Sequence, residues 1–290
     1  MDPYLHYDLL NRKHRALALK SIIQERIKPG MRVLDAGCGS GLLSIWAGQC
    51  GAQVVGVDMA DTSLAEALVQ ENDLASRVRI MRGDLFKVDL GGERFDALLA
   101  MVYLNDPRRD EDRPGLIHGL KRFLKPDALM VPDCVRYTAT PLEWPAQRTP
   151  SRWSRLDNGI AELESAYGMR MQTFKGLLRV RPNKSLFPLR GMDGLIQMDG
   201  ARRLGASCEV SVQHLQHTPA KFPNQVELAI AENGEFNVLL WEQELLFEGR
   251  LIFRNQSIGW VDPPREVQSG SPVAVALDDR WRQDNLMTAY

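Results

Sequence analysis

Three glycines and two aspartates near the start of the chain have the types and spacing of a ligand-binding turn. Gly37, Gly39 and Gly41 follow Asp35 at the end of a short apolar run, and Asp58 ends the next apolar run. Glycines let the backbone approach a ligand closely because they carry no side chain. A carboxylate at the tip of a parallel strand can accept hydrogen bonds from both hydroxyls of a ribose. These residues predict a site for a ligand with an adenosine-like ribose.

The spacing of the glycines separates two classes of ligand. Dinucleotide folds use GxGxxG, whose third glycine would fall at Leu42 of this chain. The pattern here is GxGxG, and DxGxGxG followed by an acidic strand end resembles the class I methyltransferases that use S-adenosylmethionine (SAM). A glycine turn that only connects a strand to a helix and a site for NAD are the alternatives. We expect SAM as the cofactor, with S-adenosyl-L-homocysteine as its product.

The surrounding sequence predicts the elements that must position these residues. Apolar runs that suit buried strands alternate with helical patterns over about 100 residues, which is typical of a doubly wound α/β fold. After the strand that leads into Asp35, we expect strands at 53–57, 78–81, 95–101 and 128–131 and helices at 63–74 and 116–124. The carboxyl ends of such strands share one rim. We therefore expect Asp58 and Met59 on the rim of the glycine turn, with Asp84 and the Leu85 backbone contacting adenine.

Residues 4–27 predict one or two amphipathic helices that could cover the site as a lid. Leucines and isoleucines recur there at roughly helical spacing, with basic residues, Arg15 among them, in between. Pro29 and Gly30 end this pattern before the first strand. A basic side chain on a lid can bind a ligand carboxylate through charge-assisted hydrogen bonds. The alternative is a solvated basic face.

The composition is that of an ordinary soluble globular protein. The 290 residues are 44% hydrophobic and 25% charged, with a formal net charge of -1. This balance does not favour a nucleic-acid groove or a membrane surface, and we expect neither a membrane span nor a signal peptide. Four cysteines without CxxC spacing suit a reducing compartment, so we expect a cytoplasmic protein. His214 and His217 have HxxH spacing but lack further ligands, so we expect no metal.

The sequence pattern changes after Pro132. A strand-like stretch at 135–140 leads into a proline-rich passage and a helical pattern at 156–171. Alternating segments between Asn, Gly and Pro turns then predict an antiparallel, barrel-like β domain; they lie at 208–215, 225–232, 237–247, 249–255 and 272–278. We therefore expect N-terminal lid helices at 1–28, a Rossmann-like SAM-binding domain at 29–140 and a β-barrel domain at 141–290.

Five segments resemble the protein arginine methyltransferases, in the order in which that family has them. They are LLNRKHR at 9–15, VLDAGCGSGLLSIWAGQCGA at 33–52, PDALMVPDCVRYTATPLE at 126–143, LESAYGMRM at 163–171 and GWVDPPREVQSGSPVAVAL at 259–277. The resemblance implies a SAM-binding domain followed by a β-barrel, with Arg15 holding the methionine carboxylate of SAM. It also implies a helical dimerisation arm within 150–190, and we therefore expect a homodimer.

The residues expected to bind the methyl acceptor differ from those of that family. The family orients an arginine guanidinium between two glutamates on the loop after the fourth strand. Carboxylates suit this planar cation with its fork of donors. Alignment without gaps places Met101 at the first glutamate and Asp110 at the second, and Gly259 stands at the histidine of the family's THW motif. A buried cation without paired carboxylates is destabilised. We therefore expect an acceptor other than peptidyl arginine, positioned or deprotonated by Tyr103, Asn105 and Asp110.

The sequence thus predicts a SAM-dependent methyltransferase on the arginine-methyltransferase plan with a diverged acceptor, such as a small metabolite or a biosynthetic intermediate. Two alternatives stay open. One is a protein arginine N-methyltransferase with an atypical acceptor loop, which would act on peptides. The other is a catalytically silent SAM-binding partner subunit.

Overall fold

The computed structural model describes residues 13–101, 108, 110, 112–144, 161, 164–165, 170, 195–196, 198, 200–278, 281, 286–287 and 289. The chain divides into two compact units. The first comprises Met1–Tyr137, Ser211–Phe222 and Glu242–Asn255, and the second comprises Thr138–Val210, Pro223–Trp241 and Gln256–Tyr290. Within the described residues, no helix is both long enough and apolar enough to cross a membrane.

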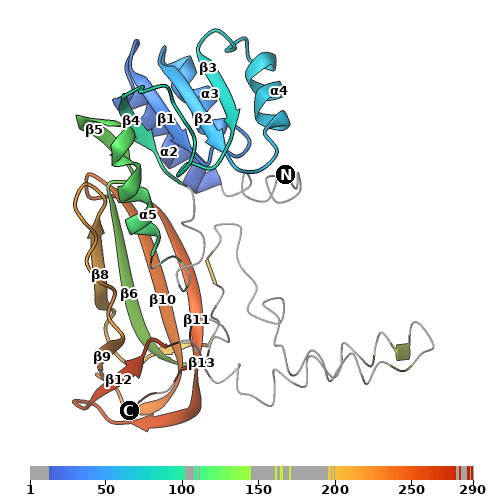
Figure 1. Ribbon diagram of the computed structural model, residues 1–290. Coiled ribbons are helices and arrows are strands. Elements are labelled where there is room, and N and C mark those ends of the chain that lie inside the picture. Colours follow the sequence, from blue (N-terminus) through green and yellow to red (C-terminus); the bar gives the residue numbers. More distant parts are fainter. Residues whose placement is uncertain are drawn as a thin grey trace. The chain divides into compact units, whose positions relative to one another are not determined.

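A five-stranded parallel sheet forms the centre of the first unit (Figure 1). Its strands are β1 (Arg32–Ala36), β2 (Gln53–Asp58), β3 (Val78–Arg82), β4 (Phe95–Leu99) and β5 (Leu124–Val131), in the order β3-β2-β1-β4-β5. The strand order reverses between β1 and β4, and ligands of open α/β sheets bind at such a switch point. The predicted Rossmann-like fold is confirmed.

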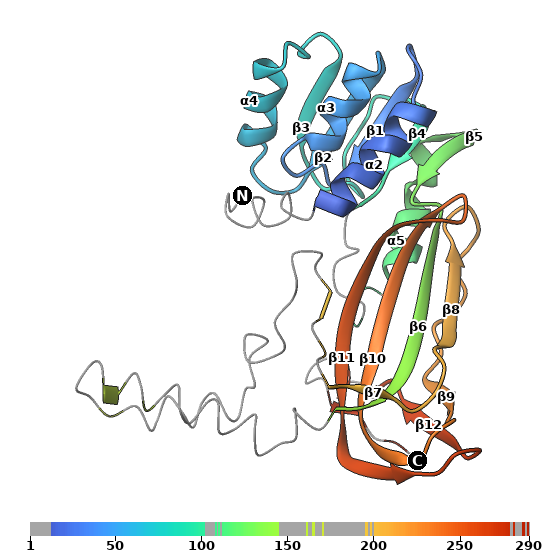
Figure 2. The same cartoon turned by 180° about the vertical axis from the view of Figure 1, so that it is seen from behind.

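Three helices cover one face of this sheet: α2 (Lys13–Arg26), α3 (Leu42–Gln49) and α4 (Ser63–Glu71) (Figure 2). Strands β1, β2 and β4 in the middle of the sheet are buried along most of their length, so they appear in the sequence as nearly continuous apolar runs. Gly48 of α3 shows how closely the helix packs on the sheet, because a Cβ there would lie 2.6 Å from Val78 Cγ2. This packing fixes the helix that follows the glycine turn.

Two helix boundaries differ from the prediction. The helix expected at 63–74 ends at Glu71, and Asp73 has a positive φ of 57°, which helical residues do not adopt. The helix expected at 116–124 instead consists of α5 (Arg113–Gly119) and a 3-10 turn, η1 (Leu120–Phe123). Strand β5 then begins at Leu124 and includes Pro126. An edge strand tolerates this proline because its missing N–H need not pair.

The later part of the chain forms the antiparallel sheet structure that the alternating segments predict. Its strands are β6 (Cys134–Glu143), β7 (Arg202–Arg203), β8 (Cys208–His214), β9 (Gln225–Ala229), β10 (Gly234–Phe247), β11 (Arg250–Val267), β12 (Pro272–Ala276) and β13 (Leu286–Met287). One sheet has the order β13-β11-β10-β6-β7 with β8 paired to β6, and β9 pairs with β12. The short β13 runs parallel to β11. The second unit has a core around Trp144 and Trp260, whose rings stack with centroids 6.2 Å apart.

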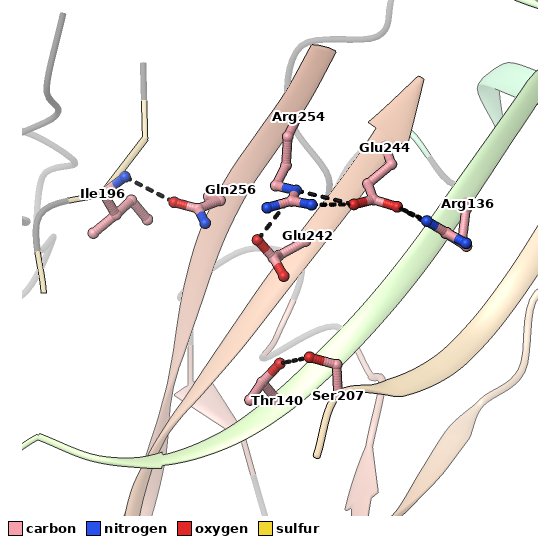
Figure 3. Close-up of polar contacts among 8 residues, drawn as sticks. All are labelled: Arg136, Thr140, Ile196, Ser207, Glu242, Glu244, Arg254 and Gln256. Carbon is pink, nitrogen blue, oxygen red and sulfur yellow. Dashed lines mark hydrogen bonds and ion pairs between the residues drawn. The ribbon is translucent and has the colours of Figure 1, made fainter. Parts of the chain in front are cut away.

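Two glutamates of β10 are buried, although the alternating pattern there predicts a half-exposed strand. The side chains of Glu242 and Glu244 are only 9% and 7% exposed. Glu244 accepts hydrogen bonds from Arg136 Nε at 2.7 Å and Arg254 Nε at 3.0 Å (Figure 3). The carboxylate of Glu242 lies 3.6 Å from Arg254 Nε. Charged side chains are buried in a strand only when paired, and these arginines supply the pairing.

Several predicted features lie outside the described residues. They are the N-terminal part of the lid helices, the acceptor-loop residues Tyr103 and Asn105, and most of the helical pattern at 156–171 with the arm expected at 150–190.

Candidate functional site

The predicted glycine turn joins β1 to α3. Gly37, Gly39 and Gly41 have φ angles of 71°, 55° and 79°, a region that side chains disfavour. The backbone N–H groups of Gly37 and Cys38 donate to Val57 O at 2.8 and 3.1 Å, which anchors the turn to β2. The three glycines therefore meet a conformational requirement of the turn.

Asp58 ties the turn to the ends of the neighbouring strands. Its Oδ2 accepts from Gly39 N at 2.9 Å, and its Oδ1 accepts from Ala60 N at 2.9 Å. Its backbone oxygen accepts from Gly83 N at 2.8 Å, at the exit of β3. The structure thus brings together three predicted parts of the site: the glycine turn, Asp58 and the segment after β3. Met59 follows Asp58 and is 61% exposed on this rim.

Asp35 lies buried at the end of β1, with 1% of its surface exposed. Ser44 Oγ of α3 donates to Asp35 Oδ2 at 2.6 Å. Burial raises the pKa of Asp35 to about 6, because water no longer solvates the charged form, and the charge of Asp58 adds to the rise. Asp35 therefore links the strand before the turn to the helix after it. Ser44 is a site residue that the sequence analysis missed, although it stands in the same motif.

Gly56 of β2 is a second residue that the analysis missed. A Cβ at this position would lie 2.8 Å from Ile80 Cδ1, 2.9 Å from Ser44 Oγ and 3.1 Å from Cys38 Cβ. Its Cα pairs with that of Asp35 in the sheet register. Gly56 therefore leaves space for the Asp35 to Ser44 contact and for Cys38 of the turn. The signal in the sequence was a glycine inside an otherwise apolar strand.

Asp84 and Leu85 follow β3 on the same rim. Asp84 Oδ1 accepts from Phe86 N at 2.9 Å, and this hydrogen bond is the main cause of the lowered pKa of Asp84. Lys87 Nζ lies 3.4 Å from Asp84 Oδ2. Arg122 Nη2, from the turn before β5, donates to Leu85 O at 3.0 Å. The segment predicted to contact adenine is thus held by its own turn and by Arg122, which the sequence analysis did not identify.

Arg15 of α2 reaches the end of β4. Its Nη2 lies 3.5 Å from Met101 O, and its guanidinium carbon lies 5.6 Å from the centre of the Phe253 ring. The helix predicted to cover the site therefore places its basic residue at the start of the predicted acceptor loop. Binding of a ligand carboxylate by Arg15 stays a prediction.

Asp110 is the predicted acceptor residue that the structure describes, whereas Tyr103 and Asn105 lie outside the described residues. Asp110 is buried, and its Oδ1 lies 3.8 Å from Arg113 Nε. Its backbone oxygen accepts from Tyr137 OH and from Arg113 N, both at 3.0 Å. The segment is thus fixed at Asp110 through its backbone as well as its side chain.

Gly259, in the second unit, stands where the resemblance places a histidine. A Cβ there would lie 2.4 Å from Met287 Sδ and 2.8 Å from Trp281 Cζ3. The space that a side chain would need is therefore already filled by packed apolar side chains.

The comparison with known families bears on the part of the chain that holds the glycine turn. Residues 33–127 match the family model for a methyltransferase domain. This range includes β1 from its second residue, β2 to β4, and every predicted cofactor residue except Arg15. The match agrees with the GxGxG spacing that the sequence analysis separated from the dinucleotide pattern.

Two curated relatives align with parts of the chain. The ribosomal protein L11 methyltransferase of Desulfitobacterium hafniense is 32% identical over 129 residues, which are 44% of this chain and 38% of the relative. Protein arginine N-methyltransferase 6 of Xenopus tropicalis is 28% identical over 152 residues, which are 52% of this chain and 43% of the relative. The chain thus spans less than half the length of these relatives.

The fold is shared with solved arginine methyltransferases over nearly the whole chain. The PRMT1 enzyme-prozyme heterotetrameric complex of Trypanosoma brucei with AdoHcy superposes with a TM-score of 0.69 and 18% identity. The similarity covers 93% of this chain and 86% of that one. The parallel sheet followed by antiparallel sheets is therefore the architecture of that family.

Proposed function

We propose that this protein is a SAM-dependent methyltransferase whose acceptor is a small metabolite or a biosynthetic intermediate and not peptidyl arginine. The observation that carries the proposal is the glycine turn after β1, whose Gly39 N–H is bound by the carboxylate of Asp58. The methyltransferase-domain match over 33–127 supports the same cofactor.

The rim residues suit the parts of SAM, which when bound supplies a methyl group activated on a sulfonium. Gly37, Gly39 and Gly41 let the backbone approach its amino-acid portion, and Arg15 binds its carboxylate. Asp35 orients the turn or the donor's amine, and the hydrogen bond from Ser44 favours the turn.

We assign binding of the nucleoside portion of SAM to the residues that follow β2 and β3. Asp58 accepts hydrogen bonds from the ribose hydroxyls, next to Met59. Asp84 and the Leu85 backbone contact adenine. The fixed turn at 84–88 supports this role, because a preformed binding segment loses little entropy when a ligand binds.

The acceptor residues support a diverged substrate. Methyl transfer is an in-line displacement, so the protein must chiefly hold the acceptor's lone pair behind the methyl group. We assign that positioning, or removal of a proton, to Tyr103, Asn105 and Asp110. Met101 at the first glutamate position supplies no carboxylate for a guanidinium. The filled space at Gly259 leaves no room for the family's histidine there.

The binding part of the proposal is tested by calorimetry with SAM and with S-adenosyl-L-homocysteine. We expect both to bind, and we expect Asp58→Ala to weaken both because it removes the ribose acceptors. Binding of NAD with no binding of SAM would overturn the proposal.

A protein arginine N-methyltransferase is the second candidate, favoured by the fold and by the relative from Xenopus tropicalis. Labelled methyl groups from SAM would then pass to histones or glycine-arginine-rich peptides, and hydrolysis would return methylarginines. We expect no such transfer, and we expect labelling of small molecules in an extract of the source cells instead.

A catalytically silent SAM-binding partner subunit is the third candidate. The missing first glutamate favours it, and the Trypanosoma brucei relative is a complex of an enzyme with a prozyme. Turnover of any acceptor by the purified chain alone would rule this candidate out.

The proposal also includes the domain limits 1–28, 29–140 and 141–290, a homodimer built on an arm within 150–190, and a cytoplasmic location.

A further inference from the structure

A line of buried hydrogen bonds crosses three neighbouring strands of the first unit and ends on the backbone of Asp110. We infer that Tyr137, Gln243 and Asn255 are positioning residues that hold the acceptor segment at Asp110. This inference rests on the proposed function, because it gives that segment its role.

The hydrogen bonds follow one another from strand to strand. Asn255 Nδ2 of β11 donates to Gln243 Oε1 of β10 at 2.7 Å. Gln243 Nε2 donates to Tyr137 OH of β6 at 3.2 Å. Tyr137 OH then donates to Asp110 O at 3.0 Å. The tyrosine hydroxyl can do both because it carries one hydrogen and two lone pairs.

The residues that form this line of hydrogen bonds are buried, and their burial indicates what the hydrogen bonds do. Tyr137 and Gln243 are fully buried, and Asn255 and Asp110 are nearly so. A buried amide or hydroxyl without a partner is destabilising, whereas apolar side chains could fill the same strand positions without that risk. The main effect of these two amides and one phenol is therefore to fix the positions of the strands and of the Asp110 backbone, and their contribution to the stability of the core is secondary.

The same strands carry a separate polar cluster at the adjacent positions Arg136, Glu244 and Arg254 (Figure 3). Successive side chains of a strand point to opposite faces, so this ion-paired cluster lies on the other face of the sheet. The ion pairs can stabilise that face without reaching Asp110. The line through Tyr137 is what contacts the acceptor segment.

Asp110 O is held from two sides, because it also accepts from Arg113 N at the start of α5 at 3.0 Å. The strands and the first turn of α5 together fix the backbone from which the Asp110 carboxylate extends. A displacement of about 1 Å in a catalytic geometry can cost about 100-fold in rate. Loss of the Tyr137 hydroxyl should therefore affect turnover more than binding.

The test compares Tyr137→Phe with Thr140→Val. Both variants remove a buried hydroxyl from β6, but Thr140 Oγ1 contacts Ser207 Oγ at 2.7 Å instead of Asp110. The rate is measured as methyl transfer from labelled SAM to the acceptors of a source-cell extract, and the affinity for SAM is measured by calorimetry. Hydrogen exchange measures how fast the Arg113 amide exchanges its proton.

For Tyr137→Phe we expect a rate at saturating SAM at least about 10-fold below that of the native chain, with the affinity for SAM within about twofold. The Arg113 amide should exchange faster in this variant. Thr140→Val should match the native protein in all three measurements. Gln243→Leu, which removes the hydrogen donated to Tyr137 but leaves the Tyr137 hydroxyl able to donate to Asp110 O, should fall between them.

Three results would overturn the inference. They are an unchanged rate in Tyr137→Phe, an equal loss in Thr140→Val, and an Arg113 amide whose exchange does not respond. If the native chain binds no SAM, the proposed function fails, and the exchange of the Arg113 amide still decides whether the strands hold the segment. If it binds SAM but transfers no methyl group, the positioning role fails as well.

Discussion

Asp35 is a carboxyl group in a buried position between a strand and a helix, and its protonation should control stability. Burial raises its pKa to about 6 from an ordinary value of 3.8. Between these values the native state binds more protons than the unfolded state, so the free energy of unfolding falls as the pH rises. In Asp35→Asn the side chain keeps its shape but no longer takes up or releases a proton.

We expect the free energy of unfolding of Asp35→Asn, relative to the native chain, to rise by up to about 3 kcal/mol between pH 4 and 6.5. Urea denaturation across this range measures it. The exposed Asp127→Asn is the control and should follow the native curve. Parallel curves for Asp35→Asn and the native chain would show that the carboxyl does not titrate in this window.

Gly56 tests whether the space under the turn matters. In Gly56→Ala the new methyl group would meet Ser44 Oγ, Cys38 and Ile80, and overpacking of this kind costs about 1–3 kcal/mol. We expect this loss by denaturation, together with weaker binding of SAM because the turn must shift. Gly115→Ala is the control, since a Cβ there meets no atom within 4 Å and the position is helical. It should leave stability unchanged or raise it, and an equal loss in both would refute a special role for Gly56.

At the scale of the element, β10 shows how a strand with acidic residues can be buried. Burial alone would raise the pKa of Glu244, but hydrogen bonds from Arg136 and Arg254 outweigh it and lower the pKa. A carboxylate with a lowered pKa stabilises the fold above its unfolded value, and that contribution is lost as the pH falls through the folded value. The strand should therefore be acid-sensitive.

We expect Glu244→Gln to reduce the free energy of unfolding at pH 7 by about 1.5–3 kcal/mol, the range for hydrogen bonds to charged groups. The difference from the native chain should shrink as the pH falls below about 4.5, the ordinary range of a glutamate. Thermal unfolding at pH 7 and pH 3.5 measures both values. Glu227→Gln on β9, where the side chain is exposed, should show little change at either pH. A constant deficit at both pH values would contradict the ion-pair explanation.

At the scale of the whole molecule, the proposed homodimer makes the plainest prediction. The resemblance places a dimerisation arm within 150–190. Light scattering at micromolar concentration should give twice the mass of the 32.7 kDa chain. Removal of residues 150–190 should return the mass to that of a monomer, and a monomeric mass for the native chain would exclude the dimer.

The succession of a parallel sheet and then antiparallel strands along the chain was predictable because each pattern is local. Alternating apolar runs and helical patterns predicted the parallel sheet, and period-two segments predicted the antiparallel strands. The boundaries at 71 and 124 were not predictable in the same way. A single residue with positive φ ended one helix, and the edge position of β5 allowed a proline inside a strand.

The sequence by itself determined the glycine turn, Asp58 and the strand ends, because glycine spacing and apolar runs report backbone geometry over a few residues. Only the tertiary structure decided that Ser44 binds Asp35, that Gly56 makes room for that contact and that Tyr137 holds Asp110. Tyr137 lies 27 positions from Asp110 and 106 from Gln243. Contacts between residues so far apart leave no period in the sequence, since they exist only once the strands have paired.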